Sequence, residues 1–126
     1  MAASVLWNPR IGDDPSPNMA ILAATASTTQ TLAGATQLLP WAINTITCAH
    51  ANDAVKLPVA LSGETCVIVT VGAAATPQVF PGLSTDQIDA VTAGASTTLT
   101  AAHRGATFYC DKDGHWTSSL FGAAAT

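Results

Sequence analysis

The chain has 126 residues, of which 48% are hydrophobic, which fits one domain with a real core rather than two domains or a disordered chain. Only 10% of the residues are charged, the formal net charge is −4, and no run of Lys or Arg occurs, which argues against a nucleic-acid-binding face. The apolar segments are too short to cross a bilayer, and the N-terminus lacks the pattern of a secretory signal. We therefore expect a cytoplasmically made protein whose sparsely charged surface is covered by partners, with a weakly charged free or secreted domain as the alternative.

Residues 1–19 are predicted to form an extended arm. Pro9, Pro15 and Pro17 exclude a regular helix or a central strand, because proline fixes φ and has no backbone donor. The apolar side chains of this segment would be costly in water, so we expect them to dock on a partner protein; a leader without a fixed partner is the alternative. The candidate partner-binding residues are Val5, Leu6, Trp7 and Ile11.

The segment that follows the arm shows moderate strand character. A short apolar run at 19–24 precedes a Thr-rich segment at 27–32. Residues 43–48 are the clearest strand of this region. A helix over 37–48 is the weaker alternative, because Pro40 and the Thr residues disfavour it.

Two neighbouring strands are predicted in the middle of the chain. In the segment 52–59, Val55, Leu57 and Val59 alternate with other residue types, which indicates a strand with one face on the core. The segment 65–71 is apolar and rich in β-branched residues at almost every position. We expect it to be the central strand, with both faces covered.

The next segments are shorter and less regular. Residues 77–81 form a short predicted strand with Pro at both ends, which suits a sheet edge. In the loop that follows, Ile88 and Val91 are expected to fill the core. Residues 86–89 are predicted to form a single helical turn capped by Thr85.

The C-terminal third predicts further strands and one hairpin. Residues 96–101 and 106–110 have strand composition. Residues 111–114 form the clearest hairpin turn, because Gly114 can take the left-handed conformation that closes such a loop. Residues 115–121 are expected to return antiparallel to the strand before the turn.

Together these elements predict an all-β fold: residues 20–126 as a single compact β-sandwich or squashed barrel of about seven to eight short strands. No convincing amphipathic helix is present in the sequence. The predicted core residues are Trp41, Val67, Val69, Phe80, Phe108 and Trp116.

The candidate chemical groups favour structure over catalysis. Cys48, Cys66 and Cys110 lie in strand-like runs and are expected to be buried free thiols, although three cysteines also permit one disulfide with one free thiol. A cysteine nucleophile lacks an identifiable third group. The spacing of Cys48 and His50 does not match a structural zinc site, and the turn at 111–114 lacks the later Glu of a calcium loop. We therefore predict no catalytic residue, no metal and no cofactor.

The tryptophans leave one binding alternative open. Trp7, Trp41 and Trp116 could form a platform on which sugar rings stack. Core packing is favoured for Trp116, because Phe108 and Leu120 are apolar neighbours, and Trp7 is better interpreted as an anchor for a partner surface.

Several motifs occur in a fixed order between residues 36 and 117. They lie at residues 52–58, 67–69, 72–73, 78–81, 93–96, 106–110 and 114–116. They read as a D-x-V-x-L-P segment, a valine-rich strand, a Q-V-[FY]-P strand, an Ala-Ser turn and a closing aromatic hairpin that ends in Trp. This order resembles a family of small structural proteins of tailed bacteriophages, although the loop at 84–91 departs from the family's usual Asp-x-Ile-Asn-Gly type of segment.

The resemblance implies a virion component rather than an enzyme. The leading expectation is a capsid decoration or cement protein, made in the host cytoplasm, that binds the major capsid protein on the outer head surface. The same setting implies a closed homo-oligomer, expected to be a trimer. A tail or fibre component that binds receptor glycan is the second expectation, and a small hydrolase is the third.

Overall fold

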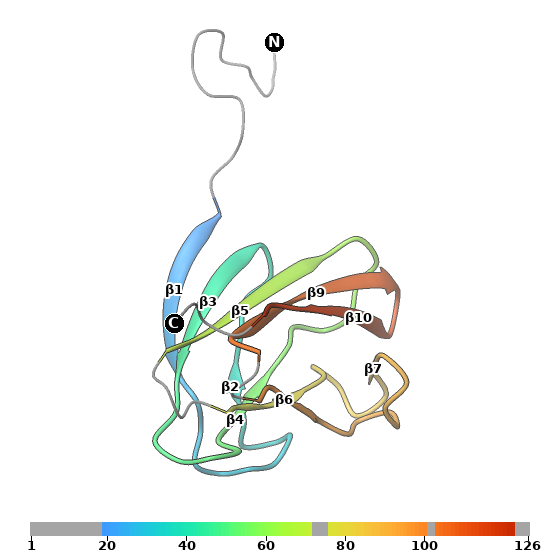
Figure 1. Cartoon of the computed structure of the whole chain (residues 1–126). Helices are drawn as coiled ribbons and strands as arrows, with labels where there is room; N and C mark the ends of the chain where they lie inside the picture. Colours follow the sequence, from blue (N-terminus) through green and yellow to red (C-terminus); the bar gives the residue numbers. More distant parts are fainter. Residues whose placement is uncertain (1–18, 72–75, 101–102, 123–126) are drawn as a thin grey trace, which may run out of the picture.

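The computed structural model describes residues 19–71, 76–100 and 103–122, and these residues form β-structure without any helix, which confirms the predicted all-β class (Figure 1). The arm residues Val5, Leu6, Trp7 and Ile11 lie outside the described residues. The strands are β1 (Ala20–Thr25), β2 (Thr36–Gln37), β3 (Ala42–Thr47), β4 (Ala54–Lys56), β5 (Thr65–Val71), β6 (Gln78–Phe80), β7 (Gln87–Ile88), β8 (Thr97–Thr98), β9 (Gly105–Lys112) and β10 (His115–Leu120).

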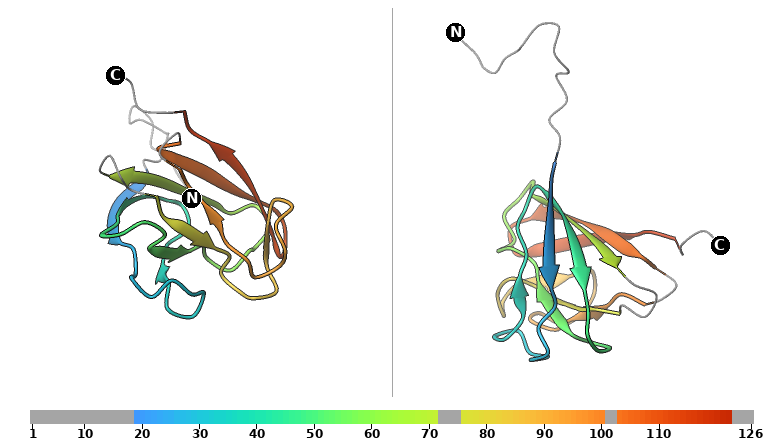
Figure 2. Two further views of the ribbon diagram at one scale, coloured as in Figure 1. Left: turned by 60° about the horizontal axis from the view of Figure 1, so that its bottom comes forward. Right: turned by 90° about the vertical axis from the view of Figure 1, so that its left-hand side faces the viewer.

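The strands form two sheets, and the chain passes back and forth between them. The larger sheet has six strands in the order β1-β3-β5-β9-β10-β7, and the smaller has four in the order β2-β4-β6-β8. From β1 to β6 each successive strand therefore belongs to the other sheet. Figure 1 shows the smaller sheet beneath the larger one, and the left view of Figure 2 brings this lower side of the molecule forward. This connectivity resembles the coils of a solenoid.

Parallel pairing between successive coils is the main feature of the register. In the larger sheet Ile21 pairs with Ile43, which pairs with Val67. The same progression occurs in the smaller sheet, where β2 pairs in parallel with β4 and β4 with β6. The chain then changes direction, because β9 is antiparallel to both β5 and β10. The first half of the domain is therefore solenoid-like, and the second half closes it with a hairpin.

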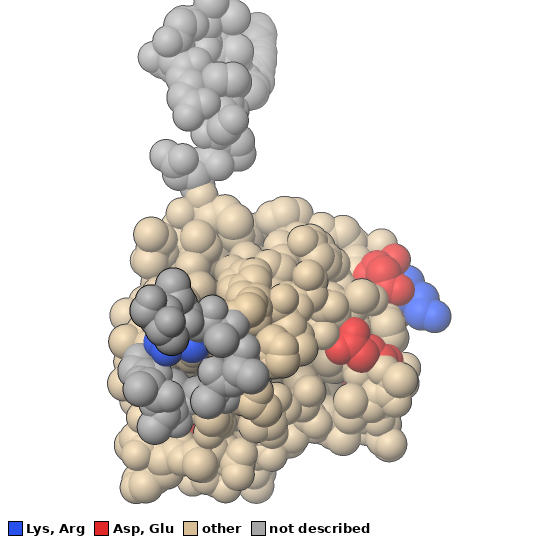
Figure 3. Space-filling model, in the orientation of Figure 1, with Lys and Arg blue, Asp and Glu red and all other residues tan. Residues whose placement is uncertain are grey.

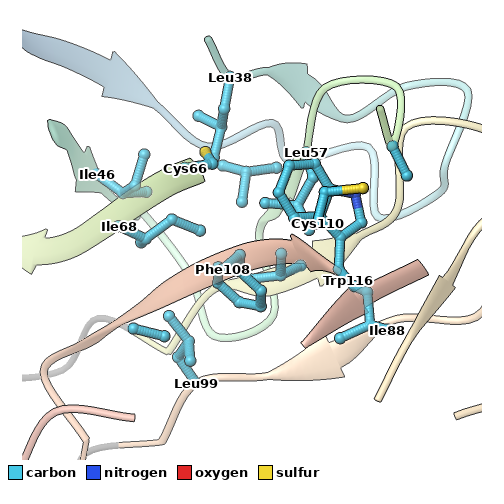
Figure 4. Packing of buried hydrophobic residues seen from close by; sticks show 14 of the residues in the cluster. Leu38, Ile46, Leu57, Cys66, Ile68, Ile88, Leu99, Phe108, Cys110 and Trp116 are labelled. Atoms are coloured by element: carbon cyan, nitrogen blue, oxygen red, sulfur yellow. The ribbon is translucent and has the colours of Figure 1, made fainter. Parts of the chain in front are cut away.

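The core consists of the side chains from both sheets that point toward each other, and it includes Phe108 and Trp116, both fully buried (Figure 4). Alternation along the strands selects these residues, since every second side chain of a strand points to the same face. Fully burying a side chain of this size contributes about 1.5–3 kcal/mol relative to exposure. The other large buried side chains of the cluster are Leu38, Ile46, Val55, Leu57, Ile68, Val79, Ile88 and Leu99.

The prediction that both faces of the central strand are covered is wrong. β5 does lie inside the larger sheet, between β3 and β9. However, Cys66 and Ile68 are fully buried, whereas Val67 and Val69 are only partly buried. The β-branched residues on the second face form a partly exposed surface instead of a second core. Phe80, also predicted to be a core residue, is partly buried as well.

The prolines at both ends of β6 predict a position at a sheet edge, and this prediction is wrong. β6 lies inside the smaller sheet, parallel to β4 and antiparallel to β8. The prolines are tolerated because Pro77 and Pro81 flank the three paired residues and so remove no ladder donor between them.

The helical turn predicted at 86–89 is also absent. Gln87–Ile88 instead forms strand β7, which pairs with β10 on the side opposite β9. Ile88 fills the core, as predicted, and is fully buried. Val91 is only partly buried.

The predicted hairpin is confirmed. β9 and β10 pair antiparallel around a tight turn, and Gly114 has a φ of 83°, in the left-handed region that glycine adopts without a steric penalty.

The strand expected at 52–59 is shorter than predicted, since β4 covers only Ala54–Lys56. The predicted alternation fails at Val59, whose side chain is exposed.

Candidate functional site

The face of the larger sheet that points away from the core is the main candidate for interaction. Alternation assigns the odd-numbered residues of β1, β3, β5 and β9 to this face, and all of them except Gly105 are partly or largely exposed. We call this surface the outer face. Its members in the middle of the sheet are Ile21, Ala23, Ile43, Thr45, Val67, Val69, Thr107 and Tyr109.

The outer face is built of cross-strand rows of β-branched residues. One row runs Ile21, Ile43, Val67 and Thr107 across four strands. Side chains opposite each other on neighbouring strands lie close enough to pack, so each row presents a continuous apolar strip. The sequence signal for this surface is the richness of these strands in Ile, Val and Thr, and the same composition also fits a second core.

Charged residues are absent from the first three strands of this sheet. The sequences of β1, β3 and β5 are AILAAT, AINTIT and TCVIVTV. In the view of Figure 3 most of the described surface is uncharged, and acidic residues gather where the β9–β10 hairpin turns. Asp111 and Lys112 belong to that end of the molecule. An uncharged, β-branched surface is costly to leave in water and suits contact with another protein.

Large apolar side chains are exposed where β3 and β5 begin. The prediction that Trp41 lies in the core is wrong, because this residue is 57% exposed. Its φ is 57°. The backbone N–H of Trp41 donates to the carbonyl of Thr65 at 2.7 Å, and Thr65 pairs with Tyr109, which is 49% exposed. Two exposed aromatic residues thus flank Thr65. Leu39 and Leu61, in the loops before β3 and β5, are exposed as well.

A hydrogen-bonded group of polar residues joins the hairpin to β7. His115 Nδ1 lies 2.6 Å from Asp111 Oδ1, and His115 Nε2 lies 2.9 Å from the carbonyl oxygen of Asp89. Both partners are acceptors, so both ring nitrogens carry a proton when both bonds form. The carboxylate of Asp111, followed by the Asp89 carbonyl, raises the pKa of His115 above its usual value. The same bond to His115 lowers the pKa of Asp111.

The other contacts of this group link Asp89 to β10. The Ser118 hydroxyl donates to Asp89 Oδ2 at 2.6 Å, and the Ser118 backbone N–H donates to Asp89 Oδ1 at 2.9 Å. A serine nucleophile needs a base that accepts its proton, and the usual base, a neutral histidine nitrogen, is not available because both nitrogens of His115 are occupied. The contacts instead hold the chain after β7 against β10.

Two buried carboxylates fix loops in the same way. Asp53 Oδ2 accepts backbone hydrogen bonds from Ala49 and His50 at 3.0 and 2.9 Å. Asp86 Oδ2 accepts one from Ala60 at 3.0 Å. Each carboxylate organises a turn by satisfying backbone donors that the sheets leave unpaired.

The three thiols are not activated. All three cysteines are free, so the structure does not contain the single disulfide that the sequence also permitted. Burial, followed by the charge of Glu64, raises the pKa of Cys66 to about 12. Burial is also the largest cause of the raised pKa values of Cys48 and Cys110. A thiol that resists deprotonation is a poor nucleophile and a poor metal ligand.

The described residues show neither a cleft nor a metal-binding group. Within residues 19–71, 76–100 and 103–122 no pocket is formed, and no three side chains of His, Cys, Asp or Glu come together as metal ligands. No helix long and apolar enough to span a membrane occurs in this part of the chain.

Comparison of the chain with protein-family models, curated proteins and solved structures finds no match.

Proposed function

We propose that this chain is a structural protein of a tailed-phage virion that decorates the capsid and stabilises it by adhesion. The outer face carries the proposal, because it presents rows of Ile, Val and Thr without a charge on β1, β3 or β5. Such a surface supports burial against another protein better than it supports chemistry on a small substrate. The motif order over residues 36–117 supplies the phage setting.

In this proposal the two sheets act as one sandwich-like body, and residues 1–19 act as an arm. The arm carries Val5, Leu6, Trp7 and Ile11 to the major capsid protein, while the β domain stays outermost on the head. Each subunit buries a modest apolar area, and repetition over the shell makes the combined attachment strong. Binding only to the assembled shell stabilises that state by mass action. The subunits would sit as trimers on local three-fold positions.

Binding to isolated heads that lack the protein tests the proposal. Wild-type chain should load to hundreds of copies per particle, measured by quantitative gel analysis and by imaging of the particles. Trp7→Ala should weaken attachment far more than Lys112→Ala, because a Trp anchor contributes about 2–3 kcal/mol when buried. Equal losses of attachment in the two variants would refute the role of Trp7 as an anchor. Failure of the wild-type chain to load would overturn the proposal.

The outer face can be tested separately with one pair of charge substitutions. Val67→Lys places a charge in the middle of the face, and Thr28→Lys places the same charge in an exposed bend between β1 and β2. The first should reduce loading by about tenfold or more, equal to about 1.4 kcal/mol. The second should leave loading unchanged, and circular dichroism of both variants would establish that they are folded.

A tail or fibre protein that binds host glycan is the second candidate, and the exposure of Trp41 favours it. Trp41 and Tyr109 flank Thr65 and leave aromatic surface open to solvent, which is how proteins stack on sugar rings. A few copies per particle, together with saccharide binding that Trp41→Ala abolishes, would support this candidate over capsid decoration.

A further inference from the structure

The first strand of the larger sheet has an open edge. Among the described strands, β1 is the outermost on its side and pairs only with β3. It is six residues long, whereas β7, β2 and β8, the other edge strands of the described residues, have two residues each. β1 is therefore the longest edge that the described strands leave without a neighbour, since on β10 only the four residues 117–120 extend beyond β7.

The hydrogen-bonding groups on this edge can be assigned from contacts on the other side of the strand. The Thr45 hydroxyl donates to the Leu22 carbonyl at 3.1 Å, so that carbonyl faces β3. Because successive peptide groups of a strand point in opposite directions, the N–H and C=O groups of Ile21 and Ala23 face the open edge. Only the carbonyl of Thr25 on this edge has a described partner, the hydroxyl of Thr36 at 2.7 Å.

The open edge lacks the features that keep natural edge strands from pairing. Its sequence, AILAAT, contains no charge and no proline, and its pairing with β3 runs without a bulge. Lys, Pro or a bulge usually protects such an edge. In addition, Ile21 on this strand is 71% exposed. Backbone groups that have no partner among the described residues, next to an exposed Ile, form a site for strand addition.

We propose that β1 pairs antiparallel with β1 of a second copy of this chain, about a two-fold axis, to form a continuous sheet across a dimer. The pairing partner has to match six residues, and among the described edges only β1 itself does so. Pairing of β1 with β7 of the next copy would build an open filament, and β7 is too short for that contact. Each chain has a net charge of −4, but neither β1 nor its neighbour β3 carries any of that charge, so two copies can approach here without repulsion.

The two-fold contact differs from the three-fold arrangement expected for a capsid protein. It is a property of the free chain and does not depend on the virion role. The dimer also joins the outer faces of two copies into one longer surface.

Sedimentation equilibrium of the full chain tests the dimer. The wild-type protein at tens of micromolar should have twice the subunit mass of 12.7 kDa. Ala23→Lys should raise the dimer dissociation constant by more than about tenfold, because the two-fold axis brings the two introduced charges close together. Ala23→Pro should act in the same direction, because it removes a donor on the open edge and leaves the bonds to β3 intact.

Ser119→Lys is the matched control, since it adds the same charge at an exposed position on β10, away from β1. This variant should remain dimeric, and the fluorescence of the buried Trp116 should show that every variant is folded. A monomeric wild-type chain, a trimer, or a dimer as sensitive to Ser119→Lys as to Ala23→Lys would each overturn the proposal. Loss of head binding with an intact dimer would count against the proposed function alone.

Discussion

Two tryptophans of the same chain have opposite environments, and this difference predicts opposite responses to truncation. Trp116 is fully buried, whereas Trp41 is 57% exposed. Trp116→Ala should lower the free energy of unfolding by about 3–5 kcal/mol, because it leaves a large cavity in the core. Trp41→Ala should change it by less than about 0.5 kcal/mol. Urea unfolding followed by circular dichroism measures both, and a stable Trp116→Ala variant would contradict the assigned core.

The sequence predicts Trp116 well and Trp41 badly, for a physical reason. Trp116 lies in a strand that alternates after a Gly turn, so its face follows from its position. Trp41 lies just before β3, where a positive φ interrupts the alternation. A positive φ is uncommon outside Gly, Asn and Asp, so a Trp at this position gives no indication of it. The candidate aromatic site beside Thr65 was therefore not predictable in its position.

His115 should make stability depend on pH. Its pKa is raised in the folded chain, so its contribution is fully present below about 6.5, the unfolded value, and is lost as pH rises through the raised pKa. The pKa of Asp111 is lowered, so its contribution is present above about 3.8 and is lost as pH falls through the folded value. The pair is therefore most stabilising between these two limits.

His115→Gln should flatten the decline in unfolding free energy above pH 6.5, and NMR titration of the wild-type ring should give a pKa above the usual value. Lys112, which opposes protonation, and Asp111 are the charged groups that act on the ring. The effect should be small, because the side chains of His115 and Asp111 are 20% and 46% exposed and the interaction is screened by solvent. An unshifted titration would show that the bond to Asp111 does not persist in solution.

Strong local signals predicted the elements best. β3, β5 and the β9–β10 hairpin appear where β-branched runs and the Asp-Gly turn place them. β7 does not follow from the sequence, because two residues of strand carry no periodicity and Thr85 just before them favours a capped helical turn. The interior position of β6 was missed because a proline's effect depends on whether its nitrogen faces a neighbouring strand, which the sequence does not show.

Gly105 marks a point where β9 tolerates no side chain. A Cβ added there would overlap the carbonyl oxygen of Ile68 on the neighbouring strand and crowd the ring of Phe121. Gly105→Ala should therefore cost about 1–3 kcal/mol of stability, because backbone cannot move aside as a flexible side chain can. Gly122→Ala is the control, since an added Cβ meets nothing there. Thermal melting of the two variants should separate them, and equal melting temperatures would contradict the close approach of β9 to β5.

At the scale of the whole molecule, the sequence predicted the class of the fold but not its connectivity. The alternation of apolar residues indicates which face of a strand is buried. It does not indicate whether the neighbouring strand runs parallel or antiparallel. The distinction between a sandwich and the solenoid-like passage of β1 to β6 between two sheets depends on that missing information. The outer face could not be predicted for a related reason. A strand rich in Ile and Val has the same sequence pattern whether its second face packs against its own chain or against a partner.

The passage of the chain between two sheets also determines how far apart in sequence the paired residues are. Ile43 lies 22 residues after its partner Ile21, Val67 lies 24 residues after Ile43, and Tyr109 lies 44 residues after Thr65. Among the described strand pairs, only the β9–β10 hairpin joins residues close in sequence. Each distant pairing requires the closure of a long loop, which costs conformational entropy before the new contacts add stability. Such topologies therefore fold slowly. The hairpin is therefore expected to form early, and until the slower pairings follow, the β-branched strands stay open to association with other copies.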